Sequence, residues 1–129
     1  MIVVDCTVVV DALTGVDGTD DLRTLLSGEQ LAAPSLLDYE VVSVLRSLTA
    51  RGALTAPRAF DVLTDFDDLR IRRWPSSDGM RRRSLQLRDN VSAYDATYLA
   101  LAEALECRLV TRDLRLARTV GHDVTVEVR

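Results

Sequence analysis

Near its amino terminus the chain reads Ile2-Val3-Val4-Asp5-Cys6-Thr7, an apolar run that ends in a carboxylate. The β-branched residues of this run favour a short buried strand. A second run, Leu109-Val110-Thr111-Arg112-Asp113, repeats the arrangement far along the chain. If the two runs are neighbouring strands of a parallel sheet, Asp5 and Asp113 lie at the same edge, where open α/β sheets bind ligands.

Strand and helix patterns alternate along the rest of the chain. We expect strands at 2–5, 30–33, 69–74, 108–111 and 124–128. We expect helices at 7–13, 19–26, 35–52, 55–66, 77–87, 92–105 and 114–120, with Thr19 and Ser35 as N-caps of the second and third. Such alternation favours a parallel sheet covered on both faces. The predicted fold is α/β, a three-layer α/β/α sandwich with a central, mostly parallel sheet, formed by residues 1–129 as a single domain.

Composition narrows the function. With 129 residues, 47% of them apolar and 5% aromatic, we expect a globular domain with an aliphatic core. All 16 basic residues are arginines, and without lysine the chain cannot form a P-loop, a phosphoacceptor receiver site or a haloacid-dehalogenase-like site. The single histidine, His122, argues against a Ser-His-Asp triad and a histidine-rich zinc site. No signal-peptide or membrane-span pattern is present, so we expect a cytoplasmic protein with two free cysteines.

Four acids carry the functional prediction. Asp5 and Asp113 follow apolar runs, whereas Glu40 and Asp95 each interrupt the apolar face of a predicted helix. Helix capping would explain Asp5, Asp95 and Asp113, and an ion pair with an arginine would explain Glu40. A divalent cation would instead stabilise all four together, and hard carboxylate oxygens suit Mg²⁺ or Mn²⁺.

Two threonines and a basic segment lie beside these acids. Thr7 and Thr111 are each two residues from an aspartate, so their hydroxyls can orient a carboxylate, although both also suit the start of a helix. Arg81, Arg82 and Arg83 lie in an arginine-rich segment of a chain whose net charge is −4. They can contact an RNA backbone, form a solvated helix face, or bind an acidic partner segment.

These pieces together resemble the PIN-domain ribonucleases, specifically the VapC-type toxins of bacterial type II toxin–antitoxin systems. Val3-Val4-Asp5-Cys6-Thr7 is similar to the D-x-[ST] start of that family, and Leu37-Asp38-Tyr39-Glu40-Val41 resembles its internal glutamate helix. The run from Ser92 to Ala102 resembles the third acidic motif, and Leu109 to Asp113 the fourth. The resemblance covers nearly the whole chain.

The resemblance implies a Mg²⁺-dependent endoribonuclease that is inhibited by a cognate antitoxin and assembles as a homodimer. By motif, Asp5, Glu40, Asp95 and Asp113 carry over as the catalytic and metal-binding acids, with Thr7 and Thr111 in support. Two alternatives remain open at this point. One is a non-catalytic partner-binding module, and the other is a metal-dependent DNA nuclease of related fold.

Overall fold

A sheet of five parallel strands forms the centre of the computed structural model, which describes all 129 residues. The strands are β1 (Ile2–Val4), β2 (Leu31–Pro34), β3 (Arg72–Trp74), β4 (Leu109–Thr111) and β5 (Val126–Val128). They lie in the order β3-β2-β1-β4-β5, and every neighbouring pair is parallel. β1 and β4 are therefore neighbours, as the sequence predicts, and the strand order reverses between them.

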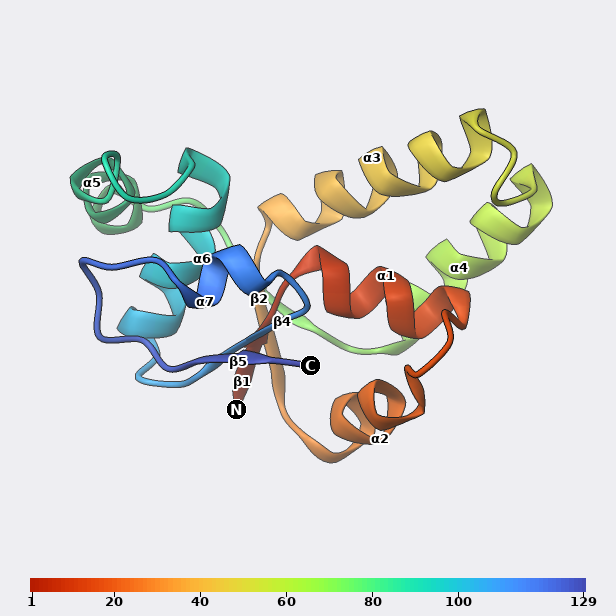
Figure 1. Cartoon of the computed structure of the whole chain (residues 1–129), viewed down its shortest axis with the longest axis horizontal. Helices are drawn as coiled ribbons and strands as arrows, with labels where there is room; N and C mark the ends of the chain where they lie inside the picture. Colours follow the sequence, from red (N-terminus) through yellow and green to blue (C-terminus); the bar gives the residue numbers. More distant parts are fainter.

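Helices cover both faces of this sheet. They are α1 (Cys6–Thr14), α2 (Asp20–Gly28), α3 (Leu36–Ala50), α4 (Ala56–Asp68), α5 (Asp78–Gln86), α6 (Ala93–Ala104) and α7 (Leu114–Ala117). α6 packs on β1, β2 and β4, and α5 packs on α6. Figure 1 shows these two helices on one side of the sheet and α1 to α4 on the other. The predicted three-layer α/β/α sandwich is confirmed.

The core is aliphatic and centred on β1. Ile2, Val3 and Val4 are all fully buried, as expected for a central strand that is covered on both faces. From α6, Ala96 and Leu99 are also fully buried, and the small alanine side chain lets the helix lie close to the sheet. The strand that ends in Asp5 is thus held rigidly from every side.

Several boundaries and caps differ from the prediction. The strand expected at 69–74 begins only at Arg72, because Arg70 adopts a left-handed conformation with φ of 53° in a turn. The helix expected at 114–120 ends at Ala117. The Thr19 and Ser35 side chains do not cap their helices: the Thr19 hydroxyl donates to the Val16 carbonyl oxygen, and Ser35 itself has helical backbone angles.

Cys6 and Cys107 are both free, as predicted. None of the helices combines the length and the apolar character needed to cross a membrane.

Candidate active site

Asp5 is the structural centre of the site. It follows β1 and forms the N-cap of α1, where its Oδ1 accepts a hydrogen bond from the Val8 amide at 3.2 Å. Its side chain is 7% exposed. The N-cap role and a position at the carboxyl edge of the sheet therefore coexist in one aspartate, as the sequence allows.

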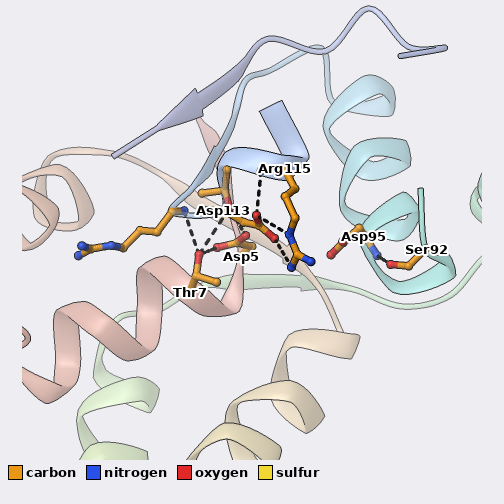
Figure 2. Close-up of polar contacts among 8 residues, drawn as sticks. Asp5, Thr7, Ser92, Asp95, Asp113 and Arg115 are labelled. Carbon is orange, nitrogen blue, oxygen red and sulfur yellow. Dashed lines mark hydrogen bonds and ion pairs between the residues drawn. The ribbon is translucent and has the colours of Figure 1, made fainter. Parts of the chain in front are cut away.

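Thr7 and Thr111 hold the Asp5 carboxylate from two sides. The Thr7 hydroxyl donates to Oδ1 at 2.6 Å, and the Thr111 hydroxyl donates to Oδ2. Each threonine oxygen in turn accepts a backbone amide, that of Arg112 for Thr7 and that of Asp113 for Thr111, at 3.0 Å in both cases. These bonds connect the ends of β1 and β4 and fix the orientation of the carboxylate (Figure 2).

Glu40 projects from the second turn of α3 and meets α6. The Tyr98 hydroxyl donates to Glu40 Oε1 at 2.6 Å, and Tyr98 itself is buried. Glu40 is only partly buried, and Val44 on the same helical face is 36% exposed, so this face of α3 is not covered along its whole length. The fully inward position suggested by the apolar pattern is therefore wrong, although the side chain does line a cleft of about 840 Å³ together with Thr7 and Asp113.

Asp95 lies in the first turn of α6 and is partly buried. Its backbone amide donates to the Ser92 hydroxyl oxygen at 3.2 Å, which is the Ser92 half of a capping box. Figure 2 shows the Asp95 carboxylate directed from α6 toward Asp113 and Arg115. Asp95 thus faces the other acids from the opposite layer of the sandwich.

Asp113 is the one acid with a cationic partner. Its Oδ1 accepts from the Arg115 backbone amide at 2.9 Å and from Arg115 Nε at 3.3 Å, and its Oδ2 lies 3.2 Å from Arg115 Nη2. The Arg115 side chain is 90% exposed. In contrast, no ion pair of the structure involves Asp5, Glu40 or Asp95.

The electrostatics separate Asp113 from the other three acids. Burial raises the pKa of Asp5, Glu40 and Asp95, and mutual repulsion among the carboxylates adds to that rise. Hydrogen bonds from Thr111, Thr7 and Tyr98 offset it only in part. Hydrogen bonds from the Arg115 side chain lower the pKa of Asp113. Three of the four carboxylates therefore lack a counter-charge.

The four acids share one end of the sheet without closing a coordination sphere. No three Asp, Glu, His or Cys side chains are positioned to hold a metal ion jointly. The donor set nevertheless consists of hard oxygen atoms, which is the chemistry that Mg²⁺ and Mn²⁺ require. Three carboxylates without cationic partners therefore give a donor set that suits a divalent cation, and the N-cap role of Asp5 does not exclude it.

Comparison with known proteins assigns the family. Residues 2–121 match the family model of the PIN domain. This chain belongs to the PIN-domain family. Its relatives include the VapC ribonuclease Mb0985 of Mycobacterium bovis, 44% identical over 119 residues that cover 92% of this chain and 91% of the relative. Ribonuclease VapC12 of Mycobacterium tuberculosis is 33% identical over 128 residues, which cover 99% of this chain and 98% of the relative.

Solved structures agree with this assignment at the level of the fold. One is the crystal structure of VapBC2 from Rickettsia felis bound to a DNA fragment of its promoter. Its matching chain superposes on this chain with a TM-score of 0.72 and 18% sequence identity, and the match covers 98% of each chain. Taken with the two ribonuclease relatives, the predicted resemblance to VapC-type PIN toxins is confirmed.

The PIN site also contains side chains that the sequence analysis did not single out. One is Tyr98, which is buried; a buried tyrosine needs a partner for its hydroxyl and so points to a nearby acceptor. Arg115 gave no signal, because residues two apart do not share a helical face. Asp11, one turn after Thr7, pairs with Arg112 at 3.2 Å beside the cleft.

Only part of the basic segment Arg81-Arg82-Arg83 is free to contact RNA. Arg82 pairs with Asp78 at 2.9 Å and Arg83 with Glu103 at 2.8 Å, so two of the three predicted RNA-contacting arginines already have acidic partners. Arg81 has none and donates only to the Ser76 hydroxyl oxygen, at 2.8 Å. The run Arg81-Arg82-Arg83 therefore does not form one continuous cationic surface.

Proposed function

We propose that this chain is a Mg²⁺-dependent endoribonuclease, the toxin of a toxin–antitoxin pair, which hydrolyses RNA phosphodiester bonds. The observation that carries the proposal is the set of carboxylates without cationic partners, Asp5, Glu40 and Asp95, around the carboxyl ends of β1 and β4. Support also comes from PIN-domain relatives that are named ribonucleases.

Asp5, Glu40, Asp95 and Asp113 would hold the divalent cation, with Mn²⁺ as a possible substitute for Mg²⁺. When bound, the cation would supply Lewis-acid polarisation of a phosphoryl oxygen and favour deprotonation of an attacking water. The chain's own residues provide the geometry. Thr7 and Thr111 keep both Asp5 oxygens in fixed directions, and Tyr98 fixes one oxygen of Glu40.

The same fixed geometry explains why the site needs no histidine or lysine. Asp5 is held by hydroxyl groups that are themselves bonded to the backbone, so its carboxylate does not reorganise when substrate arrives. Glu40 and Asp95 remain partly exposed, and Glu40 lines the open cleft. They can therefore accept a proton from, or orient, a water molecule beside a bound phosphate.

The proposed partners are an RNA substrate, a cognate antitoxin and a second copy of this chain. Solved neighbours described as toxin–antitoxin assemblies support the antitoxin, including one from Klebsiella pneumoniae and the Rickettsia felis VapBC2 complex. Co-purification with the product of a neighbouring small reading frame would test the antitoxin. Light scattering of the isolated chain would test the homodimer.

The activity test compares RNA cleavage in Mg²⁺ with cleavage in EDTA. We expect Asp5→Asn and Asp95→Asn to lower the rate at least about hundredfold, because each removes a charge that would bind the cation. Asp61→Asn is the matched control, since Asp61 is exposed on α4 and has no polar partner. Cleavage in EDTA, or full activity in both site variants, would contradict the proposal.

Substrate class is tested in the same assay. Labelled single-stranded RNA, transfer RNA and DNA are offered separately at equal concentration. We expect cleavage of RNA alone. Preferential cleavage of DNA would support the related DNA nuclease, and absence of both cleavage and Mg²⁺ binding would support a non-catalytic module.

A further inference from the structure

A second cavity adjoins the acidic cleft. It has a volume of about 580 Å³ and lies between the start of α3, the end of β3, α5 and the start of α6. Leu36 and Tyr94 line both this cavity and the acidic cleft, so the two spaces are adjacent. Tyr94 also directly precedes Asp95, one of the proposed metal ligands.

The walls of the cavity are apolar and partly aromatic. Tyr94 and Leu85 are 65% and 66% exposed, and the Trp74 ring is partly buried against the Arg72 guanidinium at 4.2 Å. Large apolar side chains seldom stay this exposed side by side unless they bind something. A volume of this size is typical of a pocket for a small organic group.

Two unpaired arginines border the same cavity. Arg81 and Arg88 are exposed, and neither forms an ion pair; Arg88 donates only to the Leu85 carbonyl oxygen, at 3.1 Å. Arg81 and Leu85 share one face of α5, and Arg88 follows in the turn after the end of the helix; all three line the cavity. The neighbouring Arg82 and Arg83 are held elsewhere by Asp78 and Glu103.

We propose that this cavity is a nucleotide subsite, in which one base of the RNA next to the scissile phosphate stacks against Tyr94 while Arg81 and Arg88 contact the flanking phosphates. The inference rests on the proposed ribonuclease function. An exposed aromatic ring and two unpaired arginines at one cavity suit a single strand, in which bases alternate with phosphates. Adjacency to the acidic cleft favours RNA over a separate protein partner, because Tyr94 lines both spaces and a strand in the cleft can pass it.

The subsite differs from the arginine contact expected from the sequence. That expectation treated Arg81, Arg82 and Arg83 as one patch and gave no role to an aromatic side chain. The structure concentrates one exposed tyrosine and two unpaired arginines at a single cavity. The position of these three side chains, and not the low aromatic content of the whole chain, therefore decides whether a base can stack here.

The test measures RNA binding without cleavage. The probe is a 5′-labelled oligouridylate of about twelve nucleotides, titrated in EDTA with the Asp95→Asn protein as the reference background. In that background we expect Tyr94→Leu to weaken binding about tenfold through loss of stacking. Arg81→Gln and Arg88→Gln are each expected to weaken it about threefold and to lower the slope of log affinity against log salt by about 1. Arg51→Gln, an exposed arginine without an ion-pair partner at the end of α3, is the control and should change nothing at the cavity.

A second measurement locates the base. RNA carrying 5-iodouridine is photocrosslinked to the same protein, and the linked peptide is identified by mass spectrometry. We expect the crosslink at Tyr94 or Trp74. A crosslink confined to other elements would overturn the subsite, as would unchanged affinity in all three variants.

The outcomes separate this inference from the proposed function. If wild-type protein cleaves RNA with Mg²⁺ but the three variants bind and cleave normally, the subsite is wrong and the nuclease stands. If RNA binding depends on Tyr94 and Arg81 but wild-type protein never cleaves, the subsite stands and the nuclease is wrong. If the variants lose the antitoxin or the dimer while RNA affinity is unchanged, the cavity belongs to a protein partner and the subsite is overturned.

Discussion

Asp113 differs from the other three acids because Arg115 already neutralises it. Two guanidinium nitrogens lie 3.3 and 3.2 Å from its two oxygens, and the same guanidinium also lowers the pKa of Asp95 through its charge. A divalent cation that binds beside Asp113 must therefore compete with this guanidinium. Because the Arg115 side chain is 90% exposed, the competition is weak and the arginine can swing into solvent.

Replacing Arg115 tests this competition. We expect Arg115→Gln to tighten Mg²⁺ binding to the isolated protein about two- to fivefold at low ionic strength, the range of an exposed ion pair. Isothermal titration calorimetry without RNA measures it. Arg118→Gln, one turn later and without a carboxylate partner, is the control. Unchanged or weaker Mg²⁺ binding in Arg115→Gln would show that the guanidinium does not oppose the ion.

The acids themselves were predictable from the sequence, whereas their partners were not. Asp5 and Asp113 follow apolar runs, and Glu40 and Asp95 break apolar faces, so local pattern alone selected them as candidates. The Arg115 contact depends on the rotamer of a long, exposed side chain, which pattern does not encode. The pairing of Arg82 and Arg83 with Asp78 and Glu103 was hidden for the same reason.

At the scale of elements, one partly buried hydrogen bond joins α3 to α6 across the site. Tyr98 on α6 donates to Glu40 on α3, and these helices belong to different layers of the sandwich. Burial and this bond to Glu40 together raise the pKa of the Tyr98 hydroxyl, so it stays protonated and remains a donor. The bond therefore sets how far apart Glu40 and Asp95 stand.

Removing the Tyr98 hydroxyl measures the contribution of this bond. We expect Tyr98→Phe to lower the free energy of unfolding by about 1 kcal/mol, because Glu40 loses its only side-chain donor while the aromatic ring still fills the core. Urea denaturation monitors the change. Tyr39→Phe, at a tyrosine that is 75% exposed, should have no measurable effect. Equal stability of Tyr98→Phe and wild type would mean that water replaces the bond without cost.

Some helix and strand boundaries agree with the sequence pattern, and others do not. The helix expected at 92–105 is found at Ala93–Ala104, because a serine cap and a continuous apolar face define both of its ends. The strand expected at 69–74 was too long, because alternation of apolar residues and arginines cannot reveal the left-handed turn at Arg70. Thr19 and Ser35 occupy the expected N-cap positions, but their side chains form no capping hydrogen bond, because residue type alone does not fix the backbone angles.

At the scale of the whole molecule, the shifted pKa values of the site acids make the free energy of unfolding depend on pH. Asp5 and Glu40 have pKa values raised above their ordinary values of 3.8 and 4.5. A carboxyl group whose pKa is raised in the folded state binds more protons folded than unfolded, so its contribution to stability falls as pH rises through the folded pKa. Asp113 has the opposite sign, but the exposure of its partner Arg115 keeps the effect small.

Metal and pH should therefore act together on stability. In EDTA at about pH 8 we expect Glu40→Gln to melt about 2–4 °C above wild type, because it removes a charge and keeps the bond from Tyr98. The difference should shrink at about pH 4, where Glu40 is protonated. Mg²⁺ should raise the melting temperature of wild type more than that of Glu40→Gln. Differential scanning fluorimetry gives all these values, with Asp61→Asn as the control.

An opposite result is easy to recognise. If Glu40→Gln melts below wild type in EDTA at the higher pH, the carboxylate stabilises the metal-free fold, and the repulsion among the acids is not significant.

The central position of β1 has a consequence during synthesis. Its two neighbours leave the ribosome at very different times, because β2 follows after one helical hairpin whereas β4 begins only at Leu109. Until then Asp5 lacks the Thr111 hydroxyl, a partner 106 positions later, and the acidic cleft lacks Asp113. The carboxylates at this end of the sheet can therefore come together only when synthesis is almost complete, and a polypeptide that stalls before Leu109 would lack the site.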